Sequence, residues 1–235
     1  MKTELLFIGG DHTRPLDIIR SPRARHMRLA VDPRNGSVRL TLPERAPIGS
    51  ALKWAETKRY WVEAQLARLP QFIAIENGMM IAVGGDSLKL DWNAAHPRNP
   101  ARVGDMLRVG GSFDEISLRI VRWLKREAKA LFEIETRHYA AKAGVTVTCV
   151  GIGDPVSRWG SCSASGDIRY SWRLILAPCH VRRATIAHEV AHRVHMNHGA
   201  AFHALVRSIF EGDPRAARVW LKTHGASLHW FGRSS

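Results

Sequence analysis

Residues 185–199 have the sequence TIAHEVAHRVHMNHG, in which two histidines stand four positions apart and a glutamate follows the first of them. Positions four apart lie on one face of an α-helix, so His188 and His192 can bind a single metal ion. Glu189 follows the first ligand, where its carboxylate can reach a water at the metal without ligating the ion. This arrangement is typical of a zinc peptidase.

The motif by itself is only moderately specific, because a long helix can carry two exposed histidines and a salt-bridged glutamate by chance. Two neighbouring features argue against that interpretation. Val190 and Ala191 suit a buried helix, so the histidines would be partly buried together and would need a partner. In addition, residues 167–176 alternate between apolar and other residues, which predicts a strand that can hold an extended substrate by main-chain hydrogen bonds.

A catalytic zinc site uses three protein ligands and one open position, so a third ligand is needed. His195 shares the helix face but lies about 10 Å along the axis from the first histidine, at about 1.5 Å per residue, too far for one ion. Asn197 and Gly199 are turn formers that can end the helix and fold the chain back. His198 between them is the natural third ligand, and His203 is the reserve candidate. His195 is assigned instead to packing or to a hydrogen bond near the site.

Apolar periodicity predicts the elements around this motif. We expect a long helix over 112–143, because Ser112 can cap its start and Gly144 is a natural stop. The metal-binding helix is expected from about Cys179 to Met196, with Pro178 near its start. The remaining expected segments are a strand at 145–150, a tight polar loop at 157–163, and helical stretches at 202–210 and 215–223.

The first half of the chain contains no chemical motif, but turn-forming residues mark the ends of its predicted strands and helices. Asn35-Gly36 lies between two alternating runs, which predicts a β-hairpin. We therefore expect strands at 25–31 and 37–42, a helix at 50–69 and a small antiparallel meander at 72–109. The predicted fold is α+β, with a zincin-like core in which the active-site helix lies beside an antiparallel sheet. The predicted domains are an N-terminal α+β region, 1–110, and a metallopeptidase domain, 111–235.

Composition restricts the compartment and the partners. The 235 residues include 35 Lys and Arg against 21 Asp and Glu, a formal net charge of +14 that permits DNA association. The three cysteines are not spaced as a disulfide framework or a Cys-x-x-Cys motif, which fits a reducing compartment. The apolar run at the start is too short and too acidic for a signal peptide, and no stretch is long enough to span a bilayer. We therefore expect a cytoplasmic protein that does not enter a membrane.

Several short motifs occur together along the chain: RWGSCS at 158–163, WRL at 172–174, AP at 177–178, HEVAH at 188–192 and NHGAAF at 197–202. In this combination the chain resembles the YgjP-like metallopeptidase family, whose core is similar to those of the SprT-like and WLM zinc peptidases. The resemblance covers most of the chain, because SPRAR at 21–25, the helix around 58–61 and WLK at 220–222 also fit the family layout.

The resemblance implies Zn²⁺ bound by His188, His192 and His198, with Glu189 as the general base. One position departs from the family pattern. The family usually has tryptophan directly after the phenylalanine of the last motif, whereas this chain has His203. The departure leaves open whether His203 only fills space or joins the site.

Hydrolysis also requires a group that stabilises the oxyanion. Tyr170, Arg158 and His195 are the candidate donors, and the sequence does not choose among them. For Arg158 a bracing role in its loop is favoured. The substrate implied by the resemblance is a protein or peptide. The alternative hypothesis is a basic, nucleic-acid-associated protein whose zinc site is structural or vestigial, although no recognisable nucleic-acid module supports it.

Overall fold

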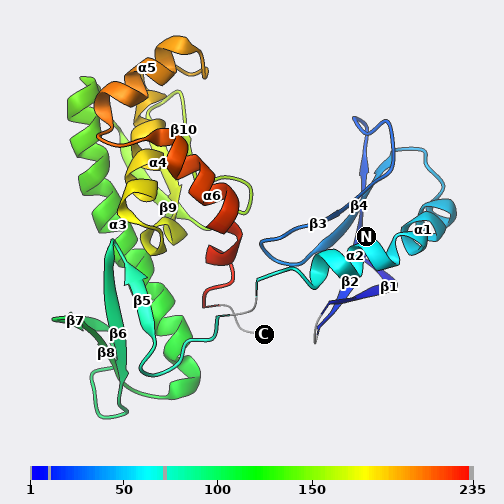
Figure 1. The fold of residues 1–235 in the computed structure, drawn as a ribbon, viewed down its shortest axis with the longest axis horizontal. Coiled ribbons are helices and arrows are strands. Elements are labelled where there is room, and N and C mark those ends of the chain that lie inside the picture. Colours follow the sequence, from blue (N-terminus) through cyan, green and yellow to red (C-terminus); the bar gives the residue numbers. More distant parts are fainter. Residues whose placement is uncertain (1, 10–11, 71–72, 233–235) are drawn as a thin grey trace. The chain divides into compact units, whose positions relative to one another are not determined.

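The computed structural model describes residues 2–9, 12–70 and 73–232, and it confirms the predicted α+β class (Figure 1). The chain divides into two compact units, Met1–Gln71 and Phe72–Ser235. The predicted domain boundary lies after residue 110, so the prediction assigned the meander at 72–109 to the first domain, whereas this division assigns it to the second unit. The first residue of the predicted meander, Phe72, lies outside the described residues.

The first unit is a four-stranded sheet with two helices against it. Buried side chains from the strands, such as Leu16 and Leu40, share a core with Ala51 and Val62 from the helices. The predicted hairpin is present, and the predicted helix at 50–69 is interrupted at Lys58. The elements are β1 (Lys2–Gly9), β2 (His12–Ser21), β3 (Arg28–Val31), β4 (Val38–Pro43), α1 (Ile48–Thr57) and α2 (Arg59–Leu66), with strand order β1-β2-β4-β3.

The second unit begins with a four-stranded sheet in the order β5-β6-β8-β7. Its hairpins are antiparallel as predicted, but the two central strands, β6 and β8, pair in parallel, so the sheet is not a simple meander. The strands are β5 (Met80–Val83), β6 (Asp86–Trp92), β7 (Ala101–Val103) and β8 (Met106–Val109).

This sheet shares one hydrophobic core with the metal-motif helix, which explains why the compact unit includes it. Its inward residues, including Ile81 and Leu107, are in the same buried cluster as Val181 and Val190 of that helix. The turn between β5 and β6 is also tied to the C-terminal half of the chain, because Gly84 N–H donates to the Ile175 carbonyl oxygen at 2.8 Å. The sheet therefore braces the segment that leads into the helix.

The remaining elements form the layer that carries the motif. The long predicted helix is present as a 3₁₀ turn and α3, and Gly144 ends it in the left-handed conformation with φ of 67°. The elements are η1 (Phe113–Glu115), α3 (Ile116–Ala143), β9 (Cys149–Gly153), β10 (Gly160–Cys162), β11 (Asp167–Ser171), η2 (Trp172–Leu176), α4 (Cys179–Ala191), α5 (Ala200–Ile209) and α6 (Pro214–Leu228).

Three predicted boundaries were wrong. The strand expected at 145–150 runs instead from Cys149 to Gly153. The strand expected over 167–176 ends at Ser171, and the chain continues as the 3₁₀ helix η2. The apolar residues of this segment remain buried except for Leu176, which is half-buried. The helix expected to reach Met196 ends at Ala191. Two residues after this end, the Arg193 guanidinium donates to two distant carbonyl oxygens, those of Thr146 at 3.1 Å and Ala164 at 3.2 Å. Sequence periodicity does not report such long-range contacts.

The sheet beside α4 is mixed and has three strands in the order β10-β11-β9. β10 and β11 are antiparallel, whereas β11 and β9 are parallel. β11, the strand predicted to hold a substrate, is therefore the central strand and has both edges paired. β10 is an edge strand, and it was predicted to be part of a loop.

Candidate metal centre

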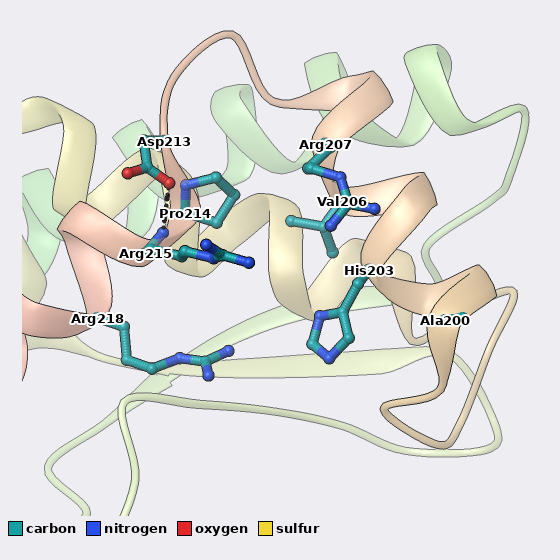
Figure 2. Close-up of a pocket in the computed structure, with 8 residues that line it drawn as sticks. All are labelled: Ala200, His203, Val206, Arg207, Asp213, Pro214, Arg215 and Arg218. Atoms are coloured by element: carbon teal, nitrogen blue, oxygen red, sulfur yellow. Dashed lines mark hydrogen bonds between the residues drawn. The ribbon is translucent and has the colours of Figure 1, made fainter.

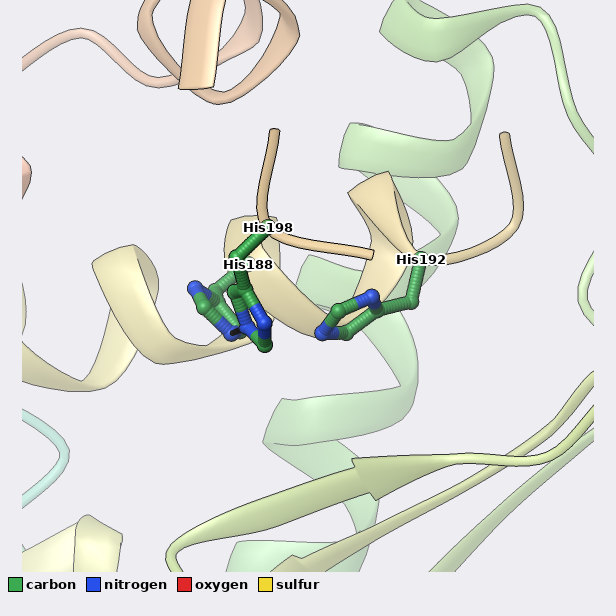
Figure 3. Close-up of side chains that lie close together, drawn as sticks. All are labelled: His188, His192 and His198. Atoms are coloured by element: carbon green, nitrogen blue, oxygen red, sulfur yellow. Dashed lines mark hydrogen bonds between the residues drawn. The ribbon is translucent and has the colours of Figure 1, made fainter. Parts of the chain in front are cut away.

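Three histidine side chains converge at the end of α4 (Figure 3). His188 lies on α4, His192 is the residue directly after its last turn, and His198 lies in the loop before α5. One nitrogen from each ring lies within 4.8 Å of the other two, and the Nε2 atoms of His188 and His198 are 3.0 Å apart. The structure thus brings together the three residues predicted as ligands.

The early end of α4 gives His195 a definite place. The His192 Nδ1 atom lies 3.0 Å from the His195 main-chain carbonyl oxygen. Since a carbonyl oxygen can only accept, this contact places the proton on Nδ1 and leaves Nε2 of His192 free to bind a metal. His195 therefore supports the cluster through its backbone.

Phe202 was missed as a site residue by the sequence analysis. It is 1% exposed, and its ring centroid lies 4.8 Å from His188, 4.6 Å from His192 and 4.8 Å from His198. One apolar ring thus packs against all three imidazoles and restricts their rotation. The sequence does not indicate that Phe202 contacts the histidines, because the three imidazole rings come together only when the loop before α5 folds back.

Glu189 is buried beside the cluster with an exposed fraction of 6%. Burial raises the pKa of its carboxyl group to about 7, and the positive charge of Arg158 partly opposes this rise. Its side chain lies against Gly160 of β10, where an added Cβ would come within 2.5 Å of Oε1. The glutamate therefore occupies a space that exists only because residue 160 has no side chain.

Burial favours the neutral form of His188 on α4 and of His192, which directly follows α4. Burial, followed by the charges of His192 and His198, lowers the pKa of His188 to about 4. Burial also lowers the pKa of His192, although its bond to the His195 carbonyl opposes the shift. Neutral imidazole is the form that binds a metal, so this environment disfavours protonation and suits ligation.

The family comparison covers this site. A protein-family model described as the YgjP-like metallopeptidase domain matches residues 25–224, most of the chain. The chain belongs to the YgjP-like family. No curated protein and no solved structure matches it significantly. Membership places this YgjP-like chain among metal-dependent hydrolases of peptide bonds, and the resemblance deduced from its short motifs is confirmed.

Two recesses adjoin the metal centre of this YgjP-like chain. One, of about 250 Å³, is lined by residues that include His188, Glu189, Arg158 and Arg218. The other, of about 310 Å³, is lined by all three clustered histidines, Glu189, Arg158 and the residues of β10. Arg158 and Glu189 therefore face the same two recesses beside the histidines.

The other predicted site residues lie elsewhere. Tyr170 is fully buried on β11, where its hydroxyl is 3.1 Å from Thr136 Oγ1, and it lines neither recess. His203 lies on α5 with its ring centroid 6.4 Å from that of His198, and among the described residues it is not part of the ligand cluster. Within the described part of the YgjP-like chain, no helix has the length and apolar character needed to cross a membrane.

Proposed function

We propose that this YgjP-like chain is a zinc-dependent peptidase in which His188, His192 and His198 hold the metal and Glu189 is the general base. The observation that carries the proposal is the juxtaposition of three imidazole nitrogens with a buried carboxylate in one open recess. Each of these residues was expected from the sequence, and their convergence from a helix and a separate loop supports the same roles.

The donor set fits zinc. Three neutral imidazoles with a fourth position open to a recess are the donor pattern of a catalytic zinc site, whereas structural sites are closed by four ligands. The nitrogens already lie within 4.8 Å of one another. At zinc–nitrogen distances of about 2.0–2.1 Å, ligand nitrogens stand about 3.3 Å apart, so only small side-chain movements are required.

A bound zinc ion supplies a Lewis acid that polarises the scissile carbonyl and makes water acidic enough to be ionised near neutral pH. The protein supplies the proton transfer. Glu189 accepts a proton on its carboxylate from the attacking water and delivers it to the departing amine nitrogen. Its burial against Gly160 fixes the position of the carboxylate, so little reorganisation is needed in each transfer.

The edge strand β10 is the substrate-binding strand that we propose. Gly160, Ser161 and Cys162 line the recess that also contains the histidines and Glu189. β10 pairs with β11 on one side, and on its other side no strand pairs with it within the described residues. An extended peptide can add to such an edge by main-chain hydrogen bonds, which would place a peptide bond next to the metal.

Arg158 is the oxyanion donor that we propose from the three sequence candidates. It lines both recesses together with Glu189, whereas the Tyr170 hydroxyl is bonded in the core and His195 contacts the cluster through its carbonyl oxygen. A guanidinium carries a permanent positive charge, which suits stabilisation of the negative oxygen that develops during attack.

The competing function is a nucleic-acid-associated protein with a structural or vestigial metal site, which the +14 charge favours. Such a site has no need of a buried carboxylate beside an open metal position. The peptidase is therefore the better supported function, and DNA association remains compatible with it.

Three variants test the proposal. The Glu189→Gln protein should retain about one zinc per chain and lose cleavage of casein and of a peptide library. His198→Ala should release zinc more readily than the matched His203→Ala control. Cleavage by Glu189→Gln at the wild-type rate would remove the general-base assignment, and zinc loss only in His203→Ala would remove the third ligand. Duplex DNA added at low and at moderate salt distinguishes a DNA-stimulated enzyme from a merely basic one.

A further inference from the structure

A larger pocket, of about 880 Å³, lies between α5 and α6 (Figure 2). We call it the arginine pocket, and its lining residues are Ala200, His203, Val206, Arg207, Asp213, Pro214, Arg215 and Arg218. Val206, Pro214 and Arg218 also line the recess over His188 and Glu189. The two spaces are therefore neighbours with a shared wall, and a ligand bound at the metal centre can extend into the arginine pocket.

The arginine pocket carries a net positive charge, because its lining has three guanidiniums and one carboxylate. Arg215 and Arg218 reach from α6 toward the space beside His203, and Arg207 stands on α5 (Figure 2). Among the described residues, none of these three guanidiniums forms an ion pair. Like charges gathered in this way repel one another, so an anion is favoured in the space between them.

The one acid in the lining, Asp213, offsets only part of this charge. Asp213 caps the start of α6, where its Oδ1 accepts a hydrogen bond from the Arg215 main-chain N–H at 2.8 Å. Its carboxylate is thus engaged with the helix backbone, and no Asp213 ion pair to a neighbouring guanidinium is found in the described part of the chain. The arginine side chains remain available for a ligand.

We propose that the arginine pocket is a specificity subsite for an acidic side chain, aspartate or glutamate, of the substrate peptide. The inference rests on the peptidase function proposed above. A guanidinium presents a planar fork that matches a carboxylate with two parallel hydrogen bonds, so two or three arginines select an acid over its amide. The subsite serves a residue near the scissile bond because the pocket shares a wall with the recess over Glu189.

A nucleic acid fits this pocket less well. Single strands are bound by a charged groove combined with aromatic side chains on which bases stack. The lining contains no tryptophan, tyrosine or phenylalanine, and its apolar residues are the small Ala200, Val206 and Pro214. The pocket thus combines guanidiniums with small aliphatic side chains, and His203 is the one aromatic side chain of its lining.

The test compares matched peptides that differ only in having Glu, Gln or Lys at each position around one cleavable bond. The wild-type, zinc-loaded protein should cleave the best-placed Glu peptide about tenfold more efficiently than the Gln peptide, as expected for a charge-assisted pair. The ratio of kcat/KM for Glu over Gln peptides is the readout, because it cancels any general defect of a variant. The ratio should shrink as salt is added.

Variants of the pocket make the assignment specific. Arg215→Gln and Arg218→Gln should each reduce the Glu/Gln ratio, and the double variant Arg215→Glu/Arg218→Glu should gain a preference for the Lys peptide. A partly unfolded protein cannot produce that gain. Arg126→Gln, which removes an exposed charge from α3 of the same unit, is the matched control and should retain the wild-type ratio.

Binding separates this inference from the peptidase proposal. Fluorescence anisotropy of labelled Glu and Gln peptides on metal-free protein should show the same preference and the same loss in the Arg215 and Arg218 variants. Absence of cleavage together with this binding preference would remove the peptidase function and keep the acidic subsite. A wild-type protein with equal kcat/KM and equal affinity for Glu and Gln peptides would overturn the subsite. The subsite would also be overturned if the Arg215 and Arg218 variants kept the Glu preference but bound a single-stranded oligonucleotide more weakly than the wild type.

Discussion

Adding one methyl group at Gly160 should disable the proposed general base without disturbing the metal ligands. In Gly160→Ala the new Cβ would lie 2.5 Å from Oε1, 2.6 Å from Cγ and 2.7 Å from Cδ of Glu189. Ordinary contacts to a Cβ begin near 3.4 Å, so the carboxylate must retreat by about 0.9 Å. The glutamate is 6% exposed, and the displaced side chain meets packed neighbours.

The expected effect is much larger on catalysis than on stability. A displacement of about 1 Å at a reacting group lowers the rate about 100-fold, so kcat/KM of Gly160→Ala should fall by about that factor. The free energy of unfolding should fall by about 1–3 kcal/mol, the usual effect of overpacking. Zinc content should stay at the wild-type level, because the nearest atoms to the added Cβ all belong to Glu189.

Gly153→Ala is the matched control, because it adds the same methyl group to another strand of the same sheet. There the nearest atoms, Arg169 Cδ and Pro155 Cδ, are both at an ordinary 3.6 Å. The assays are peptide cleavage, metal analysis and thermal unfolding of both variants and of Glu189→Gln. Wild-type kcat/KM in Gly160→Ala, or an equal loss in both alanine variants, would refute the proposed role of this contact.

Three other perturbations test how the site is supported. Phe202→Leu should weaken zinc binding about tenfold in a chelator competition, since the ring contacts all three imidazoles; an unchanged affinity would contradict this role. Glu135→Gln should lower the free energy of unfolding by about 3–5 kcal/mol, because it leaves the buried Arg182 on α4 unpaired at a contact of 2.8 Å. Glu133→Gln on the same helix breaks an exposed pair and should cost at most about 1 kcal/mol, so equal losses would argue against burial as the cause. Burial tends to raise the pKa of Asp154, but the hydrogen bonds from Arg173 lower this pKa below 3.8 overall. The stability that this carboxylate contributes should therefore be present above pH about 4 and lost as the pH falls through the folded-state pKa. The difference in Tm between the wild type and Asp154→Asn should shrink over that pH range.

The predicted ligands illustrate what local pattern can supply. His188 lies on α4 and His192, four positions later, directly follows it. The turn between His192 and α5 brings His198 close to both. Each step depends on residues within about one or two helical turns, where backbone geometry fixes the outcome. The helix end was predicted less well, and just beyond it Arg193 contacts the carbonyl oxygens of residues 146 and 164, which lie far from it in the sequence.

The strand that we propose as the substrate-binding strand could not be predicted, because strand pairing also depends on distant segments. The alternation in residues 167–176 predicts that one face of the segment is buried, and most of its apolar residues are buried in the structure. Alternation does not indicate whether a strand is central or at an edge of its sheet. That property depends on which other segments pair with it. Among the described residues β9 and β10 pair with the two sides of β11 and are the two edge strands of this sheet. The edge strand that lines the recess is β10, which has only three residues and no periodicity to detect.

The sequence by itself determined the family, the α+β class and the residues that carry the proposed chemistry, because these depend on residue type and on spacing along a single helix and turn. Only the tertiary structure decided which side chains support that chemistry. Gly160 meets Glu189 across a sheet–helix contact, Phe202 joins three rings from separate segments, and the arginines of α5 and α6 face one another across a pocket. Such proximities arise between positions far apart in the chain, where neither spacing nor propensity specifies distance.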